Sequence, residues 1–158
     1  MKNSVKKGLG FGLTSGIITT LGLIVGLSSG TNSKSVVIGG ILVIALADAF
    51  SDSLGMHISE EANRKNKTKD VWESTFSTLI FKFIFAATFI VPVLLFNLGM
   101  AVIISIIWGL LLISIFSFWI SKRNKMRAMK AVLEHLIIAI IVIIVTYFIG
   151  KFSAMIFS

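Results

Sequence analysis

The chain of 158 residues has no cysteine, one proline and only seven acidic residues. The lack of cysteine excludes disulfides and thiolate metal ligands. No P-loop, dinucleotide-binding fingerprint or nucleophile–base constellation is present, so we do not expect an enzyme or a bound cofactor. There is also no proline- or serine-rich linker and no low-complexity tract, which indicates a single domain over residues 1–158.

Apolar residues, by contrast, are abundant. They make up 56% of the chain, and the mean hydropathy is +0.96. A membrane-spanning helix needs about 20 consecutive apolar residues. The sequence therefore predicts an all-α, multi-pass membrane protein whose main partner is the lipid bilayer, with its localisation in the cell membrane. The five expected transmembrane helices cover residues 8–28, 36–60, 71–96, 99–121 and 131–157, and Pro92 is expected to kink the third.

Basic residues alternate between the two sides of this arrangement. Twelve of the fifteen lysines and arginines lie at the N-terminus or in the loops after the second and fourth spans. Only Lys34 and Lys151 lie on the other side. Because positive charge is retained in the cytoplasm, this pattern predicts a cytoplasmic N-terminus and a C-terminus outside. The net charge of +8 is then explained by membrane topology, so we expect no nucleic-acid partner. Contact with anionic lipids is a secondary role for the basic loops.

Glycine recurs at every fourth residue in two runs that begin in the first span, residues 8–16 and 22–30, and this spacing removes side chains along one stripe of a helix. Such a stripe predicts close helix packing, either within one subunit or at a dimer interface. Hydroxyl groups in the first two spans are candidates for lining a pathway. The glycines are Gly8, Gly12, Gly16, Gly22 and Gly26, and the hydroxyl residues are Ser15, Thr19 and Ser51.

Two aspartates, Asp48 and Asp52, lie deep in the second span. A carboxylate at the centre of a membrane costs roughly 2.5–3.5 kcal/mol on insertion scales, so the pair predicts an ion or proton site. Residues four apart share a helix face. Two carboxylates that close should not both ionise freely: the pKa of one would rise unless a cation, either a metal or Lys82 of the third span, lies between them.

Lys82 lies at a depth in the third span similar to that of Asp52 in the second. We therefore expect its ammonium group to pair with Asp52 or Asp48, so that a metal or proton has to compete with it. The alternative is a lysine that extends to the membrane surface.

Three further residues of the second span are candidate metal ligands. Carboxylates beside the thioether of Met56 would suit a divalent transition metal better than calcium or magnesium. Glu60 and Glu61 would lie at the cytoplasmic mouth and collect cations there. The alternative for Met56 is plain hydrophobic packing, and the alternative for the two glutamates is a solvated helix end. His57 is expected to point away from the aspartates.

Residues 16–28, 47–52 and 55–59, and more weakly 91–96, resemble the vacuolar iron transporter family. The chain is similar to a short, divergent, prokaryotic-type member that lacks the acidic cytoplasmic metal-binding region. The resemblance implies a homodimer that exports Fe²⁺ or Mn²⁺ from the cytosol in exchange for protons, along a path shaped by the first two helices.

The chain departs from this family at several positions. Ser15 stands where iron-transporting members have aspartate, Asp52 where they have methionine, and Ile44 where plant members have glutamate. Asp52 in the second helix would then compensate for the aspartate that is missing from the first helix at Ser15. The alternative is a non-transporting or different-cargo protein of the same fold, with a structural buried Asp–Lys pair.

Overall fold

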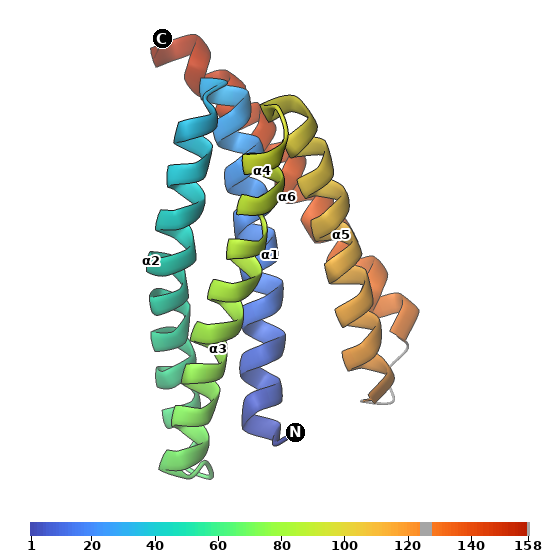
Figure 1. The fold of residues 1–158 in the computed structure, drawn as a ribbon. Coiled ribbons are helices and arrows are strands. Elements are labelled where there is room, and N and C mark those ends of the chain that lie inside the picture. The colour runs from blue at the N-terminus through green and yellow to red at the C-terminus, as the bar shows by residue number, and fades with distance from the viewer. Residues whose placement is uncertain (124–127, 158) are drawn as a thin grey trace.

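The computed structural model describes residues 1–123 and 128–157, which form six helices and no strand. Five stretches are long and apolar enough to cross a membrane, since α3 and α4 together make one span. The predicted all-α, five-span, multi-pass class is therefore confirmed. The termini lie at opposite ends of the bundle (Figure 1). The helices are α1 (Asn3–Thr31), α2 (Lys34–Glu61), α3 (Thr68–Thr88), α4 (Ile90–Leu95), α5 (Leu98–Arg123) and α6 (Ala128–Phe157).

A short turn joins α1 and α2. Asn32 adopts a left-handed conformation with φ of 47° and donates its N–H to the carbonyl of Ser28. Asparagine tolerates this conformation better than most residues, which makes it a common end for a helix. Ser33 then caps α2 by accepting a hydrogen bond from the N–H of Val36. The two helices consequently run antiparallel.

The third span is broken at Phe89, between α3 and α4. Pro92 has no N–H to donate to the carbonyl of Thr88, so the regular hydrogen bonding stops one turn before the proline. The indole N–H of Trp108 on α5 donates to the hydroxyl of Thr88 at 3.2 Å. The kink that the sequence predicted at Pro92 is thus present as a break between α3 and α4.

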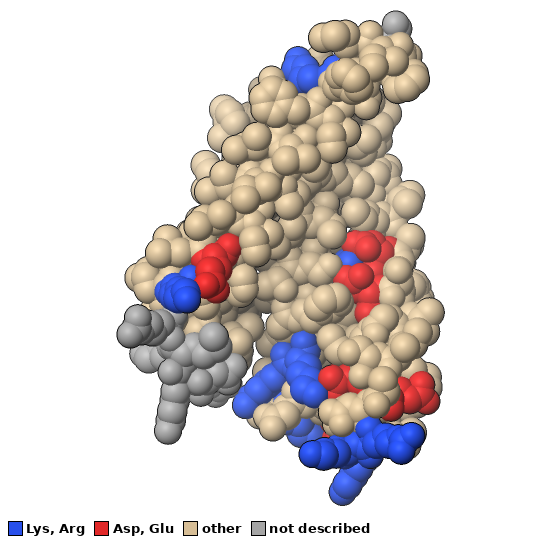
Figure 2. All heavy atoms as spheres, turned by 180° about the vertical axis from the view of Figure 1, so that it is seen from behind, with Lys and Arg blue, Asp and Glu red and all other residues tan. Residues whose placement is uncertain are grey.

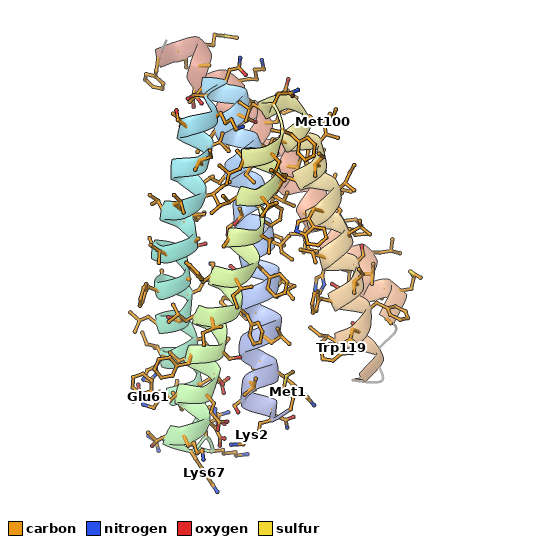
Figure 3. The ribbon with its side chains drawn as sticks, in the orientation of Figure 1. Met1, Lys2, Glu61, Lys67, Met100 and Trp119 are labelled. Carbon is orange, nitrogen blue, oxygen red and sulfur yellow. The ribbon has the colours of Figure 1, made fainter. Side chains whose placement is uncertain are left out.

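Helix α1 is the centre of the bundle and contacts α2, α3, α5 and α6. Leu13, Ile17, Leu21 and Ile24 of α1 are at most 1% exposed. Large apolar side chains project outward along α5 and α6, which suits a lipid environment (Figure 3). Because α1 is surrounded, residues on it can be held in place from several directions.

The glycines of α1 form two stripes that face different helices. A Cβ atom at Gly12 would lie 2.6 Å from the carbonyl oxygen of Thr78 on α3, and Gly8 and Gly16 also face α3. Further along, a Cβ at Gly22 would lie 3.0 Å from the side chain of Val142 on α6, and Gly26 faces α6 as well. The prediction of close packing is confirmed within one subunit.

Candidate functional site

The side chain of Lys82 on α3 is only 1% exposed and points toward α2. Its Nζ lies 2.6 Å from Oδ2 of Asp48 and also forms an ion pair with Oδ2 of Asp52. The sequence left open which aspartate Lys82 would contact. The ammonium group contacts both.

Ser15 on α1 completes this arrangement. Its hydroxyl donates to Oδ2 of Asp52 at 2.6 Å and accepts a hydrogen bond from Nζ of Lys82 at 3.0 Å. The neighbouring Gly16 allows the approach, because a Cβ there would lie 3.0 Å from the backbone oxygen of Lys82. We call Ser15, Asp48, Asp52 and Lys82 the polar cluster; it joins α1, α2 and α3.

The two carboxylates differ in how they are held. Asp52 accepts hydrogen bonds from both Ser15 and Lys82. Oδ2 of Asp48 is buried and close to the ammonium, yet it makes no hydrogen bond with a described residue. Asp48 is therefore held by charge without a directed hydrogen bond, whereas Asp52 is held by both.

The polar cluster also reaches the outer surface of α2. The Asp48 and Asp52 side chains are 28% and 21% exposed, although the ammonium between them is buried. Figure 2 shows an acidic patch partway along a largely uncharged flank. In a membrane, uncovered carboxylates at this depth would be costly.

The other predicted metal ligands lie outside the polar cluster. Met56 is partly buried on α2, and Glu61 is exposed. Both carboxylate oxygens of Glu60 accept hydrogen bonds from Nζ of Lys7 at 2.9 Å, and Nδ2 of Asn66 donates to Oε2 of Glu60 at 2.9 Å. Within the described part of the chain, no three His, Cys, Asp or Glu side chains gather as a metal site would require.

His57 points away from the polar cluster, as the sequence predicted. Its Nδ1 lies 3.0 Å from the hydroxyl of Thr75, and its ring packs against Trp72 with centroids 4.6 Å apart. Hydrogen bonding and aromatic packing account for this histidine without a bound metal.

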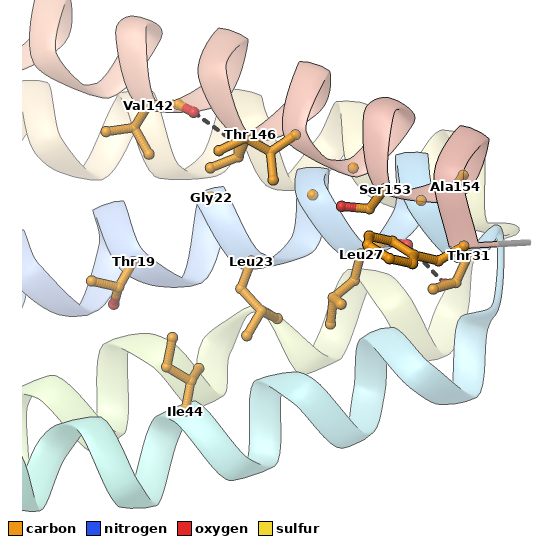
Figure 4. A pocket seen from close by; sticks show the side chains of 15 residues that line it. Thr19, Gly22, Leu23, Leu27, Thr31, Ile44, Val142, Thr146, Ser153 and Ala154 are labelled. Atoms are coloured by element: carbon orange, nitrogen blue, oxygen red, sulfur yellow. Dashed lines mark hydrogen bonds between the residues drawn. The ribbon is translucent and has the colours of Figure 1, made fainter.

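A cavity of about 820 Å³ lies between α1, α2 and α6 (Figure 4). Its lining on α1 runs from Thr19 to Thr31, so it lies beyond the polar cluster as seen from the N-terminus. Thr19 and Ile44 line it, and each lies one turn from a member of the cluster, Ser15 or Asp48. The Thr19 hydroxyl donates to the backbone oxygen of Ser15 at 2.8 Å. Ser51, the other predicted pathway hydroxyl, is exposed on α2 and does not line this cavity.

Ion pairs close the other end of α1 against α2 and α3. Besides Lys7 and Glu60, Nζ of Lys2 lies 2.5 Å from Oε1 of Glu73, and the Ser4 hydroxyl donates to Oε2 of Glu73 at 2.7 Å. The hydrogen bond to Glu73 raises the pKa of Lys2 above its ordinary value. We call these contacts the N-terminal clasp. Sequence reasoning missed Glu73, although its place near the start of α3 is the signal that could have indicated a contact with α1.

No protein-family model matches the chain, and no curated protein sequence matches it. The resemblance to vacuolar iron transporters therefore stays a prediction.

Proposed function

We propose that the chain is a proton-coupled cation exporter in which Asp48 and Asp52 bind, in turn, the ammonium group of Lys82, protons and the cargo cation. The observation that carries the proposal is a buried lysine held between two carboxylates partway along membrane-spanning helices. Each ionised group at such depth is costly, and intramembrane groups of this kind are typical of ion pathways and proton relays.

The charges of the polar cluster favour exchange over permanent binding. Two ionised aspartates and one protonated lysine sum to a charge of minus one. If the ammonium group loses its proton or moves away, the two carboxylates present a charge of minus two, which matches a divalent cation. A cation can therefore replace Lys82 without leaving the carboxylates uncompensated.

Iron or manganese is the proposed cargo because of the resemblance and the ligand types. Oxygen ligands alone suit many divalent ions, whereas a thioether favours a softer transition metal. Met56 lies one turn beyond Asp52 on α2, so its thioether projects from nearly the same helix face as the carboxylates. The metal is cargo in this proposal, and no resident cofactor is required.

The two ends of α1 support a direction of transport. The N-terminal clasp ties α1 to α2 and α3 at the predicted cytoplasmic end, while the cavity begins at Thr19, one turn from the polar cluster, and extends toward the opposite end. With the cytoplasmic orientation that the basic loops predict, we take this conformation as the outward-facing state of the proposed exporter. Export then requires the clasp to open when the cavity closes.

A homodimer would complete the polar cluster. Ser51, Gly55 and Ser59 are exposed and share the helix face of the two aspartates. No atom lies within 4 Å of a Cβ built at Gly55, so another helix has room to approach there. A second copy seated on this face of α2 would cover the partly exposed carboxylates from lipid.

The second candidate function is a non-transporting membrane protein in which the cluster serves assembly. The contacts of Asp52 with Ser15 and Lys82 favour it, because they join three helices and would stabilise the fold without any cargo.

Proteoliposome uptake of Fe²⁺, Mn²⁺ and Co²⁺ under a proton gradient distinguishes the two functions. We expect uptake by the wild type and its loss in Asp48→Asn and Asp52→Asn. Glu134→Gln is the matched control, because the Glu134 side chain is 58% exposed on α6 and lies outside the cluster. Absence of uptake by the folded wild type, or full uptake by both aspartate variants, would favour the structural role.

A further inference from the structure

A groove of about 500 Å³ lies between the beginning of α1 and the end of α5. Lys6, Lys7, Leu9 and Gly10 line it from α1, and Trp119 and Ile120 line it from α5. The groove lies where α5 diverges from α1 toward the end of the bundle that carries the N-terminus (Figure 1). It is separate from the polar cluster and from the larger cavity beside α6.

The groove carries two lysines, and they differ in whether an acidic residue pairs with them. Lys7, which also lines the groove, is paired with Glu60 as part of the N-terminal clasp. Lys6 is exposed and forms no ion pair with a described residue, and none of the residues lining the groove is acidic. An anion could therefore bind here without displacing an existing partner of Lys6.

The floor of the groove is apolar. Leu9 is 7% exposed, and Ile120 is partly buried. A Cβ at Gly10 would lie 3.7 Å from Cδ1 of Ile120, so the glycine leaves space beside that side chain. Trp119 is of the residue type that marks the level of lipid headgroups. A lysine at the rim and an apolar floor one turn deeper fit a molecule that is anionic at one end and apolar at the other.

We propose that this groove binds one anionic phospholipid, with the headgroup phosphate at Lys6 and the beginning of an acyl chain against Leu9, Gly10 and Ile120. Basic pockets between transmembrane helices are a known type of site for such headgroups. A phospholipid fits better than soluble phosphate because the apolar floor also needs to be covered. The bound lipid would fill the space between α1 and α5.

Native mass spectrometry from nanodiscs made of equal parts phosphatidylglycerol and phosphatidylcholine tests this proposal. We expect the wild type to retain one phosphatidylglycerol per chain. Lys6→Gln should reduce retention about fivefold, which corresponds to ~1 kcal/mol for one lysine near a headgroup. Gly10→Ile should reduce it by filling the groove without changing any charge, and Lys6→Arg should retain the lipid.

Lys65→Gln is the matched control, because Lys65 is exposed in the turn between α2 and α3 and its loss changes the net charge equally. Equal retention by all variants would overturn the proposal, and so would equal losses in Lys6→Gln and Lys65→Gln. If Gly10→Ile fails to fold, the difference in lipid retention between Lys6→Gln and Lys65→Gln still tests the proposal. Displacement of the lipid by millimolar inorganic phosphate would also overturn it in favour of a simple anion site. The assay measures binding alone, so its outcome is independent of transport.

Discussion

Replacing Lys82 by methionine should destabilise the protein more than neutralising all three charged residues of the polar cluster together. Lys82→Met leaves Asp48 and Asp52 side by side without their cation. Removing one partner of a buried ion pair costs about 3–5 kcal/mol. Because the two carboxylates are 28% and 21% exposed, we expect the lower end of that range, ~3 kcal/mol. The triple variant Asp48→Asn/Asp52→Asn/Lys82→Met contains no unpaired charge and should recover most of the loss.

Thermal unfolding in detergent measures this difference. For a chain of this size, ~1 kcal/mol corresponds to roughly 2–4 °C, so Lys82→Met should lower Tm by roughly 6–12 °C. Lys151→Met is the control, since Lys151 is exposed near the other end of the bundle. Among the single aspartate variants, Asp52→Asn should cost more than Asp48→Asn, because only Asp52 accepts hydrogen bonds from the serine and the lysine.

Two results would refute this reasoning. If Lys82→Met melts within about 1 °C of the wild type, the ion pairs do not contribute to stability in the way their geometry indicates. If the triple variant is less stable than Lys82→Met alone, the effects are additive and the three charges are not one interacting unit.

Three further predictions concern packing, the clasp and assembly. Gly12→Ala should cost about 1–3 kcal/mol of unfolding free energy because its Cβ would meet the backbone of α3 at 2.6 Å, whereas Gly10→Ala, with 3.7 Å of room, should melt like the wild type. Lys7→Gln removes a partly exposed ion pair, so it should change the global unfolding free energy by at most about 1 kcal/mol but speed amide hydrogen exchange in the first turns of α1. Gly55→Cys should form crosslinked dimers in this cysteine-free chain, while Ile144→Cys on the exposed face of α6 should not; equal crosslinking at both would contradict the proposed α2 interface.

Much of the fold could be predicted because span length and hydropathy are properties of single segments. The pairing of Lys82 was also predictable, since equal depth in adjacent spans follows from counting residues. Sequence could not decide between Asp48 and Asp52, because that choice depends on how α3 is rotated about its axis. In the structure, the ammonium group of Lys82 contacts the carboxylates of both aspartates.

The ends of the helices were harder to predict. Glu60 was expected as a cation collector at the mouth, and the structure shows it bound to Lys7 and Asn66. That contact joins residues 53 positions apart, so it depends on how α1 packs against α2. The glycine stripes show the same limit: their spacing predicted close approach, but only the packed bundle shows that Gly12 faces α3 and Gly22 faces α6.

Simultaneous recording of Mn²⁺ and proton flux in proteoliposomes tests the central claim most directly. With an acidic lumen, the wild type should take up Mn²⁺ while protons leave, and Asp48→Asn should lose both fluxes together although it remains folded. Mn²⁺ uptake that persists in Asp48→Asn, or wild-type uptake without any proton movement, would contradict a coupled exchange at the polar cluster.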